Sequence, residues 1–106
     1  MAIVTMKNNF KATYSAGTAQ DAVLIPAPEN YAAPRYVVQL EIPASGEGKV
    51  QGTSSSVDDI VAGTAVWFDW DSGSITSSAQ APLRYPPTAL RAYRTSGTIV
   101  LQISAR

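Results

Sequence analysis

The 106-residue chain contains no cysteine and no histidine. Without cysteine it has no disulfide framework, and its redox compartment cannot be inferred from thiol usage. Without histidine it lacks the commonest metal ligand, the usual general base near neutral pH, and the Ser/His and Cys/His nucleophile pairs. We therefore predict a non-enzymatic protein with no cofactor and no metal. A small hydrolase would need an acidic pair in a cleft.

The chain also lacks a charge excess and long apolar runs. Its eight basic and eight acidic residues cancel, and only three of the basic residues are lysines. Such a balance provides no electrostatic surface for nucleic acid or an anionic membrane. No apolar run approaches the roughly 18 residues of a membrane span. Residues 1–7 do not resemble a signal peptide. We expect a protein made in a cytoplasm that stays soluble there or leaves by a route other than secretion, with no nucleic-acid or membrane partner.

What the chain does contain is alternation of apolar and polar residues at period two. This pattern is typical of strands with one buried face, and turn residues separate the strands at short spacings. It occurs most clearly at 9–15, 36–42 and 98–104. The spacing predicts an all-β protein, an antiparallel β-sandwich or small barrel of about seven or eight short strands. We expect one domain over residues 1–106.

The clearest local prediction is a hairpin near the C-terminus. Its arms are 88–94 and 98–104, and Thr95-Ser96-Gly97 joins them as a three-residue loop with glycine at the position that takes a positive φ. The alternation predicts that four aliphatic residues of these arms belong to the core: Leu90, Ile99, Leu101 and Ile103.

Two segments interrupt the strand pattern. Residues 57–62 are the only helix candidate, because Ser56 is a good N-cap, Asp58 and Asp59 follow in the first turn, and Gly63 would end it. Residues 26–34 contain three prolines and predict an extended surface loop. On an oligomeric structural protein such a loop would reach a neighbouring subunit.

Acidic residues offer two candidate sites, and each also has a structural interpretation. Asp69 and Asp71 alternate before Gly73 as in the opening of a calcium loop, but the bidentate glutamate that such a loop needs is missing. Turn chemistry therefore explains them better. Asp58 and Asp59 are adjacent carboxylates, but neighbours on a short helix point apart. A solvated helix start is the simpler interpretation.

The aromatic residues are candidates for a contact surface. Trp67 and Trp70 are three residues apart, so in a strand they face opposite ways. One is expected in the core and the other exposed or at an interface. Exposed rings stack on sugars in carbohydrate-binding β-sandwiches. Packing in the core or between subunits is the alternative.

Arginine beside tyrosine is a composition favoured at protein interfaces. Arg91 and Tyr93 share one strand face, opposite Leu90, and four of the five arginines lie in the last quarter of the chain. A scattered solvated face is the alternative. The predicted protein-interface residues are Tyr31, Tyr36, Trp67, Trp70, Arg91 and Tyr93.

The C-terminal half resembles a class of small virion proteins of tailed bacteriophages. The matching stretches are Gly63-Thr64-Ala65-Val66-Trp67, then 87–92 (Pro-Thr-Ala-Leu-Arg-Ala) and 96–103 (Ser-Gly-Thr-Ile-Val-Leu-Gln-Ile). They cover less than half of the chain, and they are fold motifs rather than site motifs. The resemblance implies a β-sandwich on a virion, and it carries over no catalytic residue.

From this resemblance we expect a capsid decoration (cement) protein that stabilises the head through contacts with the major capsid protein or other virion proteins. We expect it on the capsid surface, assembled in the host cytoplasm, as a homo-oligomer such as a trimer. The alternatives are a head-fibre, neck or tail component, or a carbohydrate-binding β-sandwich module.

Overall fold

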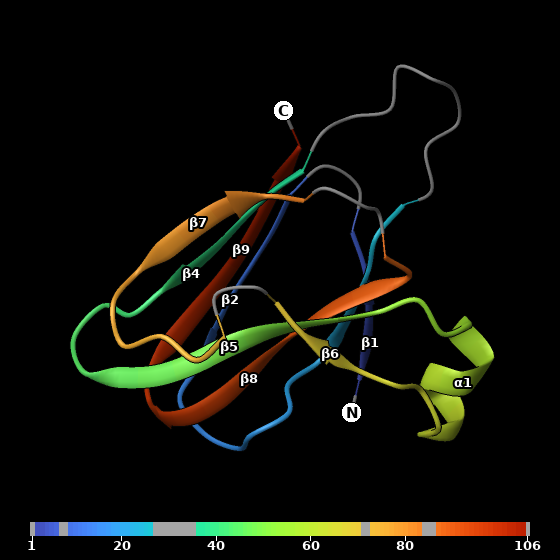
Figure 1. Cartoon of the computed structure of the whole chain (residues 1–106), viewed down its shortest axis with the longest axis horizontal. Coiled ribbons are helices and arrows are strands. Elements are labelled where there is room, and N and C mark those ends of the chain that lie inside the picture. The colour runs from blue at the N-terminus through green and yellow to red at the C-terminus, as the bar shows by residue number, and fades with distance from the viewer. Residues whose placement is uncertain (1, 7–8, 27–35, 71–72, 84–86, 106) are drawn as a thin grey trace.

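The computed structural model describes residues 2–6, 9–26, 36–70, 73–83 and 87–105. They form nine strands and one short helix, which confirms the prediction of an all-β sandwich-like fold (Figure 1). The elements are β1 (Ile3–Thr5), β2 (Asn9–Tyr14), β3 (Ala22–Leu24), β4 (Tyr36–Glu41), β5 (Gly46–Thr53), α1 (Val57–Ala62), β6 (Phe68–Asp69), β7 (Ala79–Pro82), β8 (Ala89–Gly97) and β9 (Ile99–Ala105).

The strands form two sheets. The five-stranded sheet has the order β1-β3-β8-β5-β6, and the four-stranded sheet has the order β2-β9-β4-β7. All neighbours are antiparallel except β1 and β3. Strands β2 and β4 lie where the alternation predicts them. β1 has only three residues and was not predicted, because so short a run carries no periodic signal.

The predicted C-terminal hairpin is wrong. β8 pairs with β3 and β5, whereas β9 pairs with β2 and β4, so the two consecutive strands belong to different sheets. The residues predicted as a loop, 95–97, are the end of β8, and Thr98 alone separates the strands. Period-two alternation indicates a strand and its buried face, but it does not name the strand's partner.

Gly97 lies at the point where the chain passes from one sheet to the other. Its φ is +66°, as the sequence predicts for a glycine at a sharp turn. A Cβ at this position would lie 2.1 Å from the carbonyl oxygen of Ser45 and 2.6 Å from the Cα of Gly46. The close approach of β5 therefore requires glycine here in addition to the positive φ.

The main core lies between the sheets. It contains the four aliphatic residues predicted from the C-terminal arms, all of which are fully buried. Tyr36 belongs to the same core, and Trp70 packs against it. The buried members of this core are Met6, Val23, Ile25, Tyr36, Val38, Leu40, Ile42, Val50, Leu90, Ala92, Ile99, Leu101 and Ile103.

A second, smaller cluster lies on the outer face of the five-stranded sheet, under α1. Ile60 of the helix packs with Ala22 of β3 and Ala89 of β8. The predicted helix is confirmed with both caps. The Ser56 hydroxyl accepts a hydrogen bond from the Asp59 amide at 3.2 Å, and Gly63 ends the helix with a φ of +77°. The helix therefore covers one end of this outer face.

Between α1 and β7 the chain forms little regular strand. The segment 65–70 contains only the two residues of β6, and 75–78 contributes a single bridge between Ile75 and Gly48. β5, by contrast, has eight residues. The proline-rich loop, apart from Pro26, lies outside the described residues.

Candidate functional site

Six side chains lie together on the outer face of the five-stranded sheet, beside the part that α1 covers. Along β5, Val50 points into the core, so Lys49 and Gln51 point outward. Strand pairing places Gln51 opposite Arg91 of β8 on one side and Asp69 of β6 on the other. We call this surface the Arg91 face; its residues are Lys49, Gln51, Trp67, Asp69, Arg91 and Tyr93.

Hydrogen bonds connect the face across three strands. Arg91 Nε donates to Gln51 Oε1 at 2.8 Å, and Gln51 Nε2 donates to Asp69 Oδ1 at 2.9 Å. Lys49 Nζ forms an ion pair with the other carboxylate oxygen of Asp69 at 3.0 Å. Gln51 is only 8% exposed, and its amide is used at both ends. This arrangement holds the charged groups in fixed positions.

Each cation of the face also packs on an aromatic ring. The guanidinium carbon of Arg91 lies 4.2 Å from the ring centre of Trp67, and Lys49 Nζ lies 5.0 Å from that of Tyr93. Both separations are within the range of cation–π attraction. Because Arg91 is held by a ring and by an amide, it loses less side-chain freedom when it binds a partner than a free surface arginine does.

The surroundings shift two ionisation equilibria. Hydrogen bonds from Gln51 and then Lys49 lower the pKa of Asp69, because both stabilise the carboxylate. Partial burial lowers the pKa of Arg91, because burial disfavours the charged form. Arginine nevertheless remains protonated at neutral pH. The face therefore carries two cations and one anion, a net charge of +1.

The structure brings three of the six predicted interface residues together: Trp67, Arg91 and Tyr93. Trp70 instead packs against the main core, and Tyr36 is 6% exposed within it. Tyr36 is thus almost fully buried, whereas Trp70 is only partly buried. Tyr31 lies outside the described residues.

Sequence reasoning missed Lys49 and Gln51 as members of the face. The alternation of 49–52 signals which side chains point outward, but it does not show that β5 lies between β6 and β8. For Asp69 the sequence suggests a calcium ligand or, in preference, turn chemistry, whereas the structure places it in β6. Its carboxylate is occupied by Lys49 and Gln51, and Asp71 lies outside the described residues.

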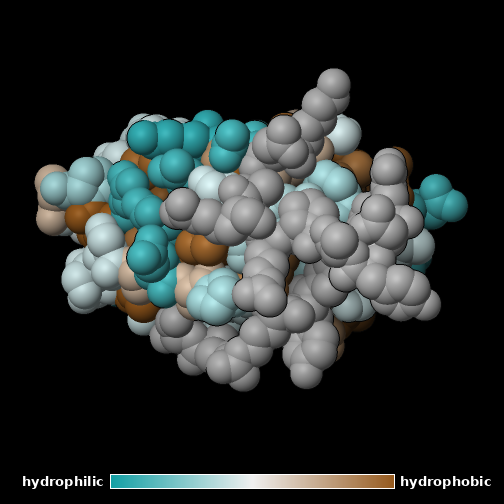
Figure 2. All heavy atoms as spheres, turned by 90° about the horizontal axis from the view of Figure 1, so that it is seen from above, coloured by the Kyte–Doolittle hydropathy of each residue, from teal (hydrophilic) through white to brown (hydrophobic). Residues whose placement is uncertain are grey.

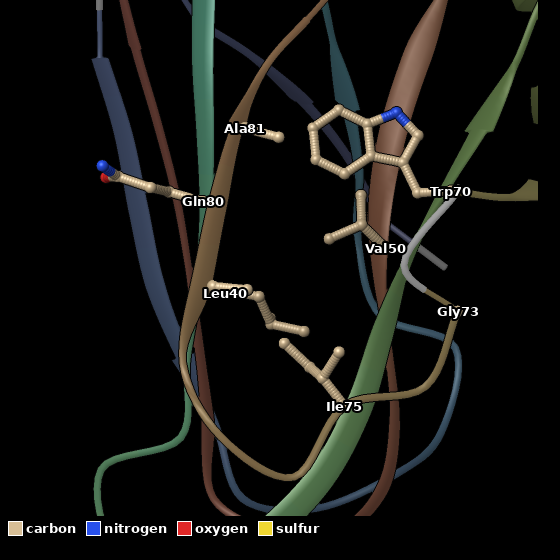
Figure 3. Close-up of a pocket in the computed structure, with 8 residues that line it drawn as sticks. Leu40, Val50, Trp70, Gly73, Ile75, Gln80 and Ala81 are labelled. Atoms are coloured by element: carbon tan, nitrogen blue, oxygen red, sulfur yellow. The ribbon is translucent and has the colours of Figure 1, made fainter.

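One cavity opens between the sheets near β7, and it is small and apolar. Leu40, Val50, Ile75 and Trp70 point into it, whereas Gln80 points away (Figure 3). Its volume of about 20 Å³ admits about one water molecule. This cavity does not hold a sugar or a cofactor. Among the described residues, no group of three His, Cys, Asp or Glu side chains is placed to hold a metal ion.

Tyr14 is the one described residue with a buried side-chain polar atom that lacks a hydrogen-bond partner. Its ring packs against the main core from the edge strand β2. Burial and the nearby charge of Asp21 raise the pKa of its hydroxyl. The residue is far from being activated for chemistry, because a raised pKa keeps it neutral.

Comparison of the chain with protein-family models, with curated proteins and with solved structures finds no match. Within the described ranges, no helix has the length and apolar character needed to cross a membrane.

Proposed function

We propose that the protein is a non-enzymatic virion structural protein, a capsid decoration protein that binds other virion proteins through the Arg91 face. The observation that carries this proposal is the composition and order of that face. Arginine, tryptophan and tyrosine dominate binding energy at protein interfaces, above all when they are held rigidly. Here Arg91 and Tyr93 lie on the interior strand β8, and the ring of Trp67 packs against Arg91.

The virion setting comes from the resemblance of 63–67, 87–92 and 96–103 to small tailed-phage virion proteins. The two lines of support meet in β8, which contains part of the resembling stretch and contributes Arg91 and Tyr93 to the face. The mechanism would be mechanical. Many copies on a shell, as homo-oligomers, would each bury a modest interface against the major capsid protein, and multivalency would make the attachment strong.

Exposed apolar side chains are scattered over the surface. In the view from above, apolar residues appear as separate brown spots between hydrophilic ones (Figure 2). The apolar side chains that are most exposed among the described residues are Val57, Val61, Val66 and Phe68. Val57 and Val61 belong to α1, and Val66 lies in the segment that follows it. Phe68 belongs to β6, where it points to the opposite side of the sheet from Asp69.

The test is the copy number of this chain in purified particles, measured by quantitative mass spectrometry against the major capsid protein. A decoration protein is present at a number comparable with that of the capsid protein. A small fraction of that number would place the chain in a neck, tail or fibre. Absence from the particles would refute the proposal. Titration of tryptophan fluorescence with cell-surface polysaccharide is the control, and a decoration protein gives no response.

A further inference from the structure

Within the described residues, no carboxylate balances the charge of Arg91. The only ion pair there joins Lys49 to Asp69. Arg91 donates through Nε to the neutral amide of Gln51, and the described residues accept no hydrogen bond from its two terminal nitrogens. As far as the described residues go, these two terminal nitrogens are strong donors left for another group.

Asp69 is the acidic residue of the face, and it is already in use. One of its oxygens accepts from Gln51 and the other from Lys49. Gln51 stands between Asp69 and Arg91 in the sheet register, so the two charged groups occupy strands that are not neighbours. The Gln51 amide forms a hydrogen bond with each of these two charged groups, but it does not neutralise the charge of Arg91.

The guanidinium is also oriented in advance. The ring of Trp67 covers one of its faces at 4.2 Å, and the bond to Gln51 fixes its rotation. A guanidinium with fixed orientation and incomplete hydration is suited to bidentate binding of a planar oxyanion, since the two terminal N–H groups match the two oxygens of a carboxylate.

We propose that the Arg91 face binds its partner protein through an aspartate or glutamate side chain of that partner, which accepts two hydrogen bonds from Arg91. This inference rests on the proposed function, because the partner is the virion protein on which the chain docks. The charge of the face supports a single carboxylate. Its net charge of +1 matches one acidic side chain, whereas a nucleic-acid backbone requires several phosphate contacts.

The first test needs no partner. The Nε–H signal of Arg91 and the indole N–H signal of Trp67 are followed by NMR during titration with sodium acetate, at constant ionic strength kept with sodium chloride. We expect saturable shifts of both signals with a dissociation constant on the order of 10–100 mM, typical of one charge-assisted pair. In Arg91→Met the Trp67 signal no longer shifts. No saturable shift in the wild type, or saturation with phosphate alone, would overturn the carboxylate assignment.

The second test uses particles. Arg91→Met is expected to weaken attachment at least about tenfold. Arg91→Lys retains the charge but not the planar pair of donors, so its loss should be smaller yet measurable. The control is Lys11→Met, which removes an exposed cation from the four-stranded sheet. Its attachment should equal that of the wild type.

The two failures are distinguishable. If the wild type does not attach to particles, the proposed function fails, and the acetate titration still decides whether Arg91 binds a carboxylate. If the wild type attaches and both Arg91 variants attach as tightly as the wild type, the proposed binding of a partner carboxylate by Arg91 is refuted. The proposed virion role then stands. The thermal unfolding midpoint of each variant identifies any loss caused by misfolding.

Discussion

The outer faces of the two sheets differ in kind, although β8 and β9, which contribute to them, are consecutive in the chain. The Arg91 face has two cations, two aromatic rings and an amide engaged at both ends. The outer face of the four-stranded sheet has a row of Lys11, Gln102, Gln39 and Gln80 in register across four strands.

The row on the four-stranded sheet is polar like the Arg91 face, but its side chains are not connected across strands by hydrogen bonds among the described residues. Its one side-chain hydrogen bond among the described residues joins Gln39 to Glu41 within a single strand. None of the described outward residues of β2, β4 and β9 is aromatic. Long side chains that nothing holds in place lose rotamer freedom when a partner orders them. Side-chain hydrogen bonds between strands, rather than polarity, therefore distinguish the Arg91 face from the other outer face.

The largest expected effect comes from Gly97→Ala. This change would disturb the turn at which the chain passes from β8 in one sheet to β9 in the other. The new methyl group would meet the backbone of β5 at a residue whose φ is +66°. We expect the free energy of unfolding, measured by urea denaturation, to fall by on the order of 4 kcal/mol.

The matched control for this change is Gly63→Ala. Gly63 has a similar φ of +77°, but nothing lies within 4 Å of its added Cβ. It should cost about 1 kcal/mol, the strain of the left-handed conformation alone. Equal losses at Gly63 and Gly97 would show that close packing at the corner does not matter.

Leu90→Ala and Leu101→Ala remove core side chains behind the two outer faces. Both residues are fully buried in the same core, one from each sheet. Each change should lower the free energy of unfolding by about 3 kcal/mol. Val61→Ala, at a side chain 69% exposed on α1, is the control and should change it by less than about 0.5 kcal/mol. A much smaller loss in either core variant would mean that its sheet is loosely packed.

Gln51→Ala tests the difference between the faces directly. It removes the acceptor of Arg91 and one donor to Asp69. We expect a loss of about 2 kcal/mol, because the partly buried Arg91 guanidinium and the Asp69 carboxylate each lose a hydrogen bond. Gln102→Ala, the equivalent change in the row of the other sheet, should alter stability by less than about 0.5 kcal/mol. If chemical denaturation gives equal losses for the two variants, the Arg91 face has no special order.

The smallest effect concerns pH. The lowered pKa of Asp69 means that its carboxylate stabilises the folded state above its unfolded pKa of about 4, and that this contribution disappears as the pH falls through the lower folded pKa. The effect is small because the side chain is 48% exposed. The urea midpoint followed from pH 6 to pH 2 should fall less in Asp69→Asn than in the wild type. Lys49→Met should reduce the same slope, and an unchanged slope in both variants would contradict this assignment.

The predictable part of the fold is the part set by neighbours in the chain. Ser56, Asp59 and Gly63 form the caps of α1 within eight residues, so local chemistry identifies the helix and both its ends. The buried side of β9 follows from alternation in the same way. For the candidate site, alternation identifies Arg91 and Tyr93 as sharing a face. It does not identify Gln51, which is 40 positions away from Arg91 and reaches it only through strand pairing.

The two tryptophans show the same division. Their spacing of three predicts opposite sides of an extended segment, and they do lie in different environments. Which of them is in the core depends on the neighbours that tertiary structure supplies. Trp70 faces the space between the sheets, where Leu40 and Val50 meet it, and Trp67 meets Arg91 outside.

The amino-acid sequence by itself therefore determined the strand content, the capped helix, the core residues of β8 and β9, and the positive φ at Gly97. These depend on backbone conformation and on alternation, which act over a few residues. Only the tertiary structure decided that β8 and β9 part into different sheets, and that Arg91 meets Gln51, Asp69 and Trp67. Strand partners are chosen by burial over the whole molecule, so a local pattern compatible with a hairpin is equally compatible with a crossing between two sheets.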